Sequence, residues 1–116
     1  MKIALCGATG RAGSRILNEL VKRGHQVVGI VREAGSLPPR AGVVVAVNDL
    51  TDSGRTAETI KGADAFVSAY APPPDDLEEL VRVTKRLVEA TDRSGVNRFL
   101  MVGGAGSLEV SPGLTL

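Results

Sequence analysis

Short apolar runs alternate along the chain with longer stretches in which apolar residues recur at helical spacing. The short runs are rich in Val, Ile, Leu, Ala and Phe and lack clean polar alternation, which is typical of strands buried on both faces of a sheet. Strands are predicted over residues 2–6, 26–31, 43–47, 63–68 and 98–102. Because helical stretches separate them, the pattern indicates βαβ units around a parallel sheet.

Helices are predicted between these strands. The first carries one apolar stripe formed by Ala12, Ile16, Leu17, Leu20 and Val21. Gly24 is placed to end this helix in the left-handed conformation. The second helix is predicted over residues 53–61 and the third over residues 76–94, with Asp75 and Asp76 as caps of the third.

The predicted fold is therefore α/β and Rossmann-type. We expect a three-layer, doubly wound parallel sheet of about five strands in the order 3-2-1-4-5. Residues 1–116 show no internal repeat and no interdomain linker, so a single Rossmann-type domain is predicted.

Composition narrows the classes of partner. The chain has 116 residues, a formal net charge of +1 and 3% aromatic residues. Nucleic-acid-binding proteins combine a basic footprint with stacking aromatic side chains, and neither is present. We expect no nucleic acid partner.

The single cysteine, Cys6, cannot form a disulfide within the chain, and no paired Cys/His spacing indicates a metal site. Gly7 interrupts the apolar stretch after Met1 and leaves no signal-peptide core. No run approaches the roughly 18 apolar residues of a membrane span. These features predict a soluble, cytoplasmic protein without a membrane partner.

Three glycines, Gly7, Gly10 and Gly13, are spaced G-x-x-G-x-x-G directly after a predicted strand and at the start of a predicted helix. This is the context of a dinucleotide loop. The first glycine permits a sharp turn, the second allows the backbone to approach the pyrophosphate, and the third allows close packing of helix on sheet. A glycine-rich turn that binds nothing is the alternative, and the agreement of spacing with element order favours binding.

The end of the second predicted strand bears on the choice of cofactor. In this fold an acidic residue there binds the ribose 2′-hydroxyl of NAD, whereas an arginine accommodates the 2′-phosphate of NADP. Arg32 follows the predicted strand, and Arg11 in the loop is a second candidate cation. Glu33 would take the place of Arg32 if the strand boundary shifted by one residue. The sequence favours NADP(H) over NAD(H).

Four stretches together resemble the NmrA-like NAD(P)H-binding family of atypical short-chain dehydrogenase/reductases, which includes flavin and biliverdin reductases. They are the loop Gly7-Ala8-Thr9-Gly10-Arg11-Ala12-Gly13, then Val28-Gly29-Ile30-Val31-Arg32, then Asn48-Asp49-Leu50, and finally Met101-Val102-Gly103-Gly104-Ala105-Gly106-Ser107-Leu108. The resemblance spans nearly the whole chain.

The resemblance assigns site residues by position. It implies that the pyrophosphate is held by Thr9, Gly10, Arg11 and Ala12 and that the 2′-phosphate is held by Arg32. Asp49 and Leu50 would flank the adenine. Ala69 and Tyr70 would run beside the riboses, and Gly103 and Gly104 would approach the nicotinamide. A turn or cap role is the alternative for Asp49, and covering the sheet edge is the alternative for Tyr70.

The chain departs from the family in its catalytic residues. The Tyr-x-x-x-Lys pair of many short-chain reductases is absent, since Pro74 stands four residues after Tyr70, and Gly104 occupies the position expected for a serine. The leading hypothesis is an NAD(P)H-dependent oxidoreductase acting on a small conjugated or flavin-like acceptor. The alternatives are an NADP(H) sensor without chemistry and a purely structural domain.

Relatives of this group continue beyond the position of Leu116. We therefore expect a truncated or cleaved chain that holds the nucleotide half and lacks most of the substrate half. Such a chain would expose apolar sheet edge, which predicts a homo-oligomer.

Overall fold

The computed structural model describes residues 1–70, 77–103 and 106–110. In chain order the elements are β1 Lys2–Cys6, α1 Arg11–Lys22, β2 Gln26–Val31, β3 Val43–Val47, α2 Ser53–Ile60, β4 Ala65–Ser68, α3 Leu77–Ser94, β5 Phe99–Gly103 and β6 Gly106–Val110. Predicted and observed bounds agree to within two residues for the five predicted strands. The caps predicted at Asp75 and Asp76 lie outside the described residues.

The strands form a single sheet in the order β3-β2-β1-β4-β5-β6. β1 to β5 run parallel to their neighbours, so that Leu5 in β1 lies opposite Gly29 in β2 and Val67 in β4. The predicted Rossmann-type order 3-2-1-4-5 is confirmed. The sheet also contains an edge strand that was not predicted, because β6 pairs antiparallel with β5.

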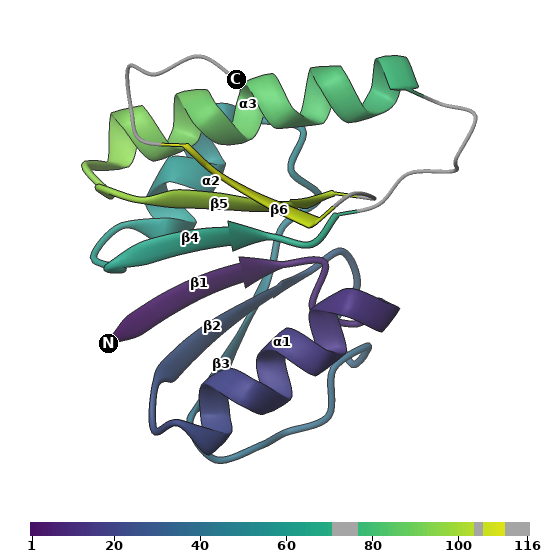
Figure 1. Cartoon of the computed structure of the whole chain (residues 1–116), viewed down its shortest axis with the longest axis vertical. Coiled ribbons are helices and arrows are strands. Elements are labelled where there is room, and N and C mark those ends of the chain that lie inside the picture. The colour runs from purple at the N-terminus through teal and green to yellow at the C-terminus, as the bar shows by residue number, and fades with distance from the viewer. Residues whose placement is uncertain (71–76, 104–105, 111–116) are drawn as a thin grey trace.

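Helices cover both faces of the sheet, as Figure 1 shows, with α1 on one face and α2 and α3 on the other. Alternate strand residues face opposite layers. Ile3 and Leu5 of β1 pack with Leu17 of α1, whereas Ala4 and Cys6 pack with the α2 and α3 residues. The structure therefore has three layers, with the sheet between α1 on one face and α2 and α3 on the other. One hydrophobic core fills the space on each face of the sheet.

Local sequence signals explain where α1 ends and where α2 begins. Gly24 adopts a φ of +84° after α1, and the amides of Gly24 and His25 donate to the carbonyls of Val21 and Leu20. This pair of bonds is a Schellman motif, which confirms the predicted role of Gly24. α2 begins after Asp52, whose carboxylate accepts from the amides of Gly54 and Arg55 at 2.8 and 3.2 Å.

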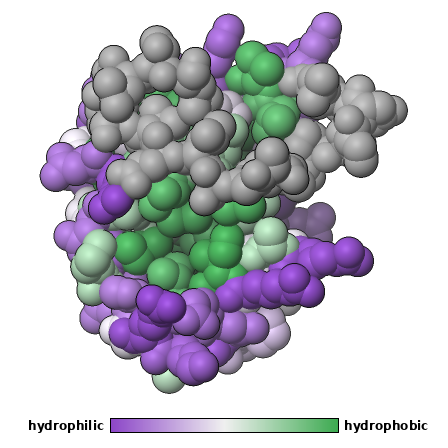
Figure 2. Space-filling model, viewed as in Figure 1, coloured by the Kyte–Doolittle hydropathy of each residue, from purple (hydrophilic) through white to green (hydrophobic). Residues whose placement is uncertain are grey.

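In the described part of the chain, apolar surface is exposed both at the edge of the sheet and on one of its faces. At the β3 edge, Val44, Val45 and Val47 keep 67%, 37% and 46% of their surface. The second surface lies on the α1 face of the sheet, where half-buried Ile16 and Leu100 border the core (Figure 2). None of the described helices has the length and apolar character needed to span a bilayer.

Candidate functional site

Two of the three loop glycines are required by the packing of the loop itself. Gly7 follows β1 with a φ of +73°, and a Cβ at this position would lie 2.6 Å from the carbonyl carbon of Ala69. A Cβ on Gly13 would lie 1.8 Å from the carbonyl oxygen of Gly7. The first glycine therefore makes the turn and the third brings α1 against the end of β1, as their spacing predicts.

The middle glycine is different, because the chain leaves room for a side chain there. Gly10 has a φ of −75°, and a Cβ would meet only the Gly7 carbonyl oxygen at 3.4 Å, which is ordinary contact. Gly10 is also the N-cap of α1, and no side chain caps the helix. The first amides of α1 have no partner within the helix, so this end of α1 can accept an anion.

A cleft of about 480 Å³ lies against this helix end. Its lining consists of Gly7, Thr9, Gly10, Arg11, Ala12, Arg15, Ala69 and Tyr70. Within the described part of the chain, the side chains of Arg11 and Arg15 make no hydrogen bond or ion pair. Two like charges one helical turn apart repel each other, so an anion in the cleft would stabilise them. Arg15 had not been selected from the sequence.

A second cleft, of about 300 Å³, lies where β2, β3 and β4 end. It is lined by Arg32, Asp49, Leu50, Thr51, Tyr70, Glu79, Val83 and Arg86. Tyr70 lines both clefts, so the two form a continuous surface along the carboxyl ends of the strands. Ligands of open α/β sheets bind at this edge.

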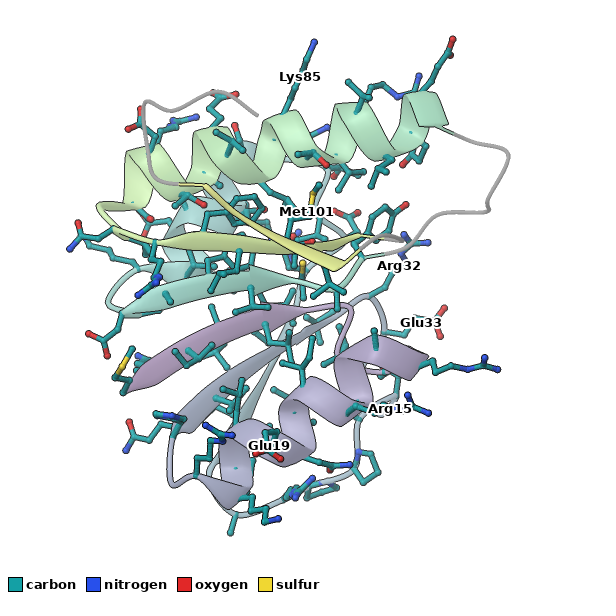
Figure 3. The ribbon with its side chains drawn as sticks, in the orientation of Figure 1. Arg15, Glu19, Arg32, Glu33, Lys85 and Met101 are labelled. Atoms are coloured by element: carbon teal, nitrogen blue, oxygen red, sulfur yellow. The ribbon has the colours of Figure 1, made fainter. Side chains whose placement is uncertain are left out.

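Arg32 and Glu33 come directly after β2, which ends at Val31 as predicted. Figure 3 shows both side chains at the end of the sheet where α1 begins. Arg32 is exposed, lines the second cleft and has no polar partner among the described residues. Glu33 is not part of the lining of either cleft. The strand boundary thus places the arginine, and not the glutamate, in the cleft.

Asp49 takes part in a local turn after β3. Its carboxylate accepts from the Thr51 hydroxyl at 2.7 Å and from the Thr51 amide at 3.1 Å. These bonds lower the pKa of Asp49. The turn role considered for Asp49 is therefore present in the structure, and Asp49 is also one of the residues that line the second cleft.

Leu50 is held by two residues that the sequence did not single out. Its amide donates to Asn48 Oδ1 at 2.8 Å, and its carbonyl accepts from Arg86 at 3.1 Å. Asn48 is buried, with 2% of its surface exposed, and its Nδ2 donates to the Thr59 hydroxyl at 3.1 Å. No periodicity in the sequence could indicate these contacts, since Arg86 lies 36 residues from Leu50.

Tyr70 is half-buried at the junction of the clefts, and its hydroxyl donates to Glu79 at 3.4 Å. A hydrogen bond from Arg82 lowers the pKa of Glu79. Gly103 ends β5 opposite Gly106. Gly104 lies outside the described residues. The two clefts thus bring together predicted residues from the loop after β1 to the end of β4.

Cys6 lies in the core and not in either cleft. Burial raises the pKa of its thiol from 9.0 to about 11. A protonated, buried thiol is a poor nucleophile and a poor metal ligand. Within residues 1–70, 77–103 and 106–110, no cluster of three or more His, Cys, Asp or Glu is placed to hold a metal ion.

Comparison with known proteins shows the class to which this chain belongs. A family described as NAD(P)H-binding matches residues 7–115. The match covers both clefts and nearly the whole sequence. The chain therefore belongs to the NAD(P)H-binding family, and its cofactor is a nicotinamide dinucleotide.

Individual relatives agree with this class. The uncharacterised protein YwnB of Bacillus subtilis (strain 168) is 39% identical over 99% of this chain and 53% of YwnB. A solved structure of a proposed exported protein from Burkholderia pseudomallei is 44% identical, with a TM-score of 0.78 over 100% of this chain and 54% of that chain. A proposed NADH-flavin reductase from Streptococcus pneumoniae TIGR4 is 35% identical, with a TM-score of 0.74 over 93% of this chain and 49% of that chain. This chain thus spans about half the length of these relatives.

Proposed function

We propose that this chain forms the NADP(H)-binding part of an NAD(P)H-dependent oxidoreductase of the atypical short-chain, NmrA-like type. The observation that carries the proposal is the start of α1. Gly10 is a glycine that the fold does not require, and it lies beside helix amides without a side-chain cap and beside two arginines that have no polar partner among the described residues. A pyrophosphate at this position would meet the amides, the positive end of the helix and both guanidinium groups.

The 2′-phosphate of NADP(H) is assigned to Arg32. Support comes from the exposed guanidinium in the second cleft, which has no polar partner in the described part of the chain, and from the absence of Glu33 from the cleft lining. The carboxylate of Asp49, a residue of the same cleft, accepts hydrogen bonds from Thr51. With Thr9 to Ala12 at the phosphates and Leu50 at the adenine, the dinucleotide would extend past Ala69 and Tyr70 toward Gly103 and Gly104.

The test is a calorimetric titration of NADPH and NADH against the wild type and Arg32→Ala. A charge-assisted hydrogen bond contributes about 1.5–3 kcal/mol, so NADPH affinity is expected to fall about tenfold or more, with a smaller loss for NADH. Arg93→Ala is the matched control, because Arg93 is an exposed arginine of α3 that lines neither cleft. Equal losses for the two cofactors would contradict the assignment of Arg32.

The proposed reaction is hydride transfer to a flavin-like or small conjugated acceptor. The nicotinamide supplies the hydride when the cofactor is bound, and the protein supplies binding and orientation. Such a reaction does not need the Tyr-x-x-x-Lys pair that the sequence lacks. If the protein binds NADPH but does not oxidise it with flavins, quinones or aldehydes, the reductase proposal loses its support.

A nucleotide sensor is the second candidate, and one observation favours it. The hydroxyl of Tyr70, the single tyrosine of the chain, is bonded to the carboxylate of Glu79, which does not prepare it as a catalytic acid. A sensor would bind oxidised and reduced cofactor with similar affinity and would change its contact with a regulatory protein. Turnover of NADPH with any acceptor would exclude this candidate.

Self-association through β3 is also proposed. The Asn48 amide donates to the Val31 carbonyl and the Gly42 carbonyl accepts from the Val27 amide. Backbone groups alternate in direction along a strand, so the amide and carbonyl of Val45 point away from β2. An antiparallel pair of two β3 strands centred on Val45 would satisfy these groups in both copies.

The composition of β3 favours the same arrangement. The β3 strand itself carries no charged residue and no proline that would protect a sheet edge.

The cytoplasm stays the proposed compartment, since the one cysteine is unpaired and buried.

A further inference from the structure

Leu50 has a backbone conformation that needs an explanation. It is the one residue other than glycine with a positive φ, +65°, in the described part of the chain. A side chain with a Cβ is disfavoured in this region, at a cost of about 1–3 kcal/mol. Such a conformation persists only where the surrounding structure holds it, and it is concentrated at functional sites.

Asn48 holds Leu50 from the side of the sheet. Its amide oxygen accepts the Leu50 amide, and its Nδ2 donates to the hydroxyls of Thr59 at 3.1 Å and Thr56 at 3.5 Å. The side chain of Asn48 is therefore fixed to α2 at one end and to the Leu50 peptide at the other. Because Asn48 is buried, removing this side chain would leave the Leu50 amide without its partner.

Arg86 holds Leu50 from the side of α3. One guanidinium nitrogen donates to the Leu50 carbonyl at 3.1 Å, and the side chain is half-buried in the wall of the second cleft. A guanidinium group has five N–H donors in a planar arrangement. Within the described residues its hydrogen bond goes to Leu50, and its charge also lowers the pKa of Glu79 in the same cleft, so N–H donors remain for a ligand.

The two arginines of this cleft approach it from different elements. Arg32 follows β2 and Arg86 comes from α3, while Leu50 lines the same cleft from the turn after β3. A flat guanidinium group both stacks on an aromatic ring and donates to ring nitrogens, which an ammonium group does less well. The base of a nucleotide offers both a ring face and acceptor nitrogens.

We propose that Arg86 contacts the purine of the bound dinucleotide and that Asn48 and Arg86 together position Leu50 beneath this ring. The inference rests on the proposed function and adds two residues to it. Asn48 acts as a positioning residue, because it reaches the ligand only through Leu50. Arg86 determines affinity for the adenylate end and has no part in binding the pyrophosphate, which lies in the first cleft.

The test measures two probes by calorimetry on wild type, Arg86→Ala, Arg86→Lys and Arg93→Ala. Adenosine 2′,5′-bisphosphate reports on the second cleft, and inorganic pyrophosphate reports on the loop cleft. Arg86→Ala is expected to bind the adenosine probe about tenfold more weakly, with unchanged pyrophosphate affinity. Arg86→Lys keeps the charge without the planar group, so a smaller loss of the same kind is expected, and Arg93→Ala should match the wild type.

Several outcomes would overturn the inference. Wild-type affinity for the adenosine probe in both Arg86 variants would remove the base contact while leaving the proposed function intact. Equal losses for the two probes would show that Arg86 supports the fold and not the base. Failure of the wild-type protein to bind either the adenosine probe or NADPH would overturn the proposed function itself. If Arg86→Ala does not fold, Arg86→Lys gives the same comparison.

Asn48 is tested by Asn48→Ala and by Asn48→Asp. The aspartate keeps the oxygen that accepts the Leu50 amide but cannot donate to Thr59. We expect adenosine-probe affinity to fall in Asn48→Ala and to be partly kept in Asn48→Asp, with pyrophosphate affinity unchanged in both. Equal affinity of Asn48→Ala and wild type for the adenosine probe would contradict the positioning role.

Discussion

The carbonyl oxygen of Gly7 and the α-carbon of Gly13 are so close that a methyl group on Gly13 would lie 1.8 Å from this oxygen. The contact joins the end of β1 to the first turn of α1. No side chain can move to relieve it, because both partners are backbone atoms. The loop is therefore fixed by packing as well as by its use as a binding surface.

Gly13→Ala and Gly10→Ala are expected to separate these two roles. Overpacking costs about 1–3 kcal/mol, and Gly13→Ala should reach or exceed this range because backbone must move. Gly10→Ala replaces a helix N-cap with open space around it, so its free energy of unfolding should stay within about 1 kcal/mol of wild type. NADPH affinity should nevertheless fall in Gly10→Ala.

Chemical denaturation and calorimetry check both variants. A Gly13→Ala protein as stable as the wild type would contradict the close contact. A Gly10→Ala protein with wild-type NADPH affinity would contradict the binding role of the loop.

The buried thiol predicts a loss of stability at alkaline pH. The pKa of Cys6 is about 11 in the folded protein, against 9.0 for the free group. Because the folded value is raised, the folded state favours the protonated thiol, and this stabilisation is complete below pH 9.0 and decreases as the pH rises toward 11. The wild type should therefore lose more stability than Cys6→Ala over this interval.

Chemical denaturation of the wild type and of Cys6→Ala at pH 9.0 and at about pH 11 gives the change in the free energy of unfolding for each protein. All other ionisable groups are common to both proteins, so their contributions cancel in the comparison. Identical slopes for wild type and Cys6→Ala would show that the thiol does not contribute. Native protein should also resist alkylation by iodoacetamide until it is unfolded.

The edge strand β3 gives a prediction about oligomeric state. Val45→Lys places a charge at the centre of the proposed strand pair and should convert a wild-type dimer to a monomer in sedimentation velocity. Val81→Lys is the matched control, because Val81 is 50% exposed on α3, away from the β3 edge. A wild-type monomer at all concentrations, or an equal effect of both lysines, would contradict pairing through β3.

Most of the fold could be predicted because each element carries its own signal. Strands β1, β2 and β3 have the predicted bounds, since apolar runs with clear ends define them. The start of β4 was placed too early, because the Ala63 amide donates to the Ile60 carbonyl and so belongs to the turn after α2. Local pattern does not distinguish such a turn from the strand that follows it.

β6 could not be predicted in the same way. Gly106 and Ser107 have little preference for strands, and this strand exists through its pairing with β5. The bonds from Asn48 and Arg86 to Leu50 were likewise invisible in the sequence, because they depend on how α2 and α3 pack against the turn after β3. The sequence indicated the loop and Arg32, whereas the partners of Leu50 required the fold.

The place of Tyr70 where the two clefts meet has a practical consequence. The chain contains 1 tyrosine and no tryptophan. All of its ultraviolet emission above the phenylalanine background therefore comes from one ring whose surroundings are known. A ligand that extends from the loop cleft to the second cleft passes this ring, so its arrival can be followed as a change in emission from a single site, without any label.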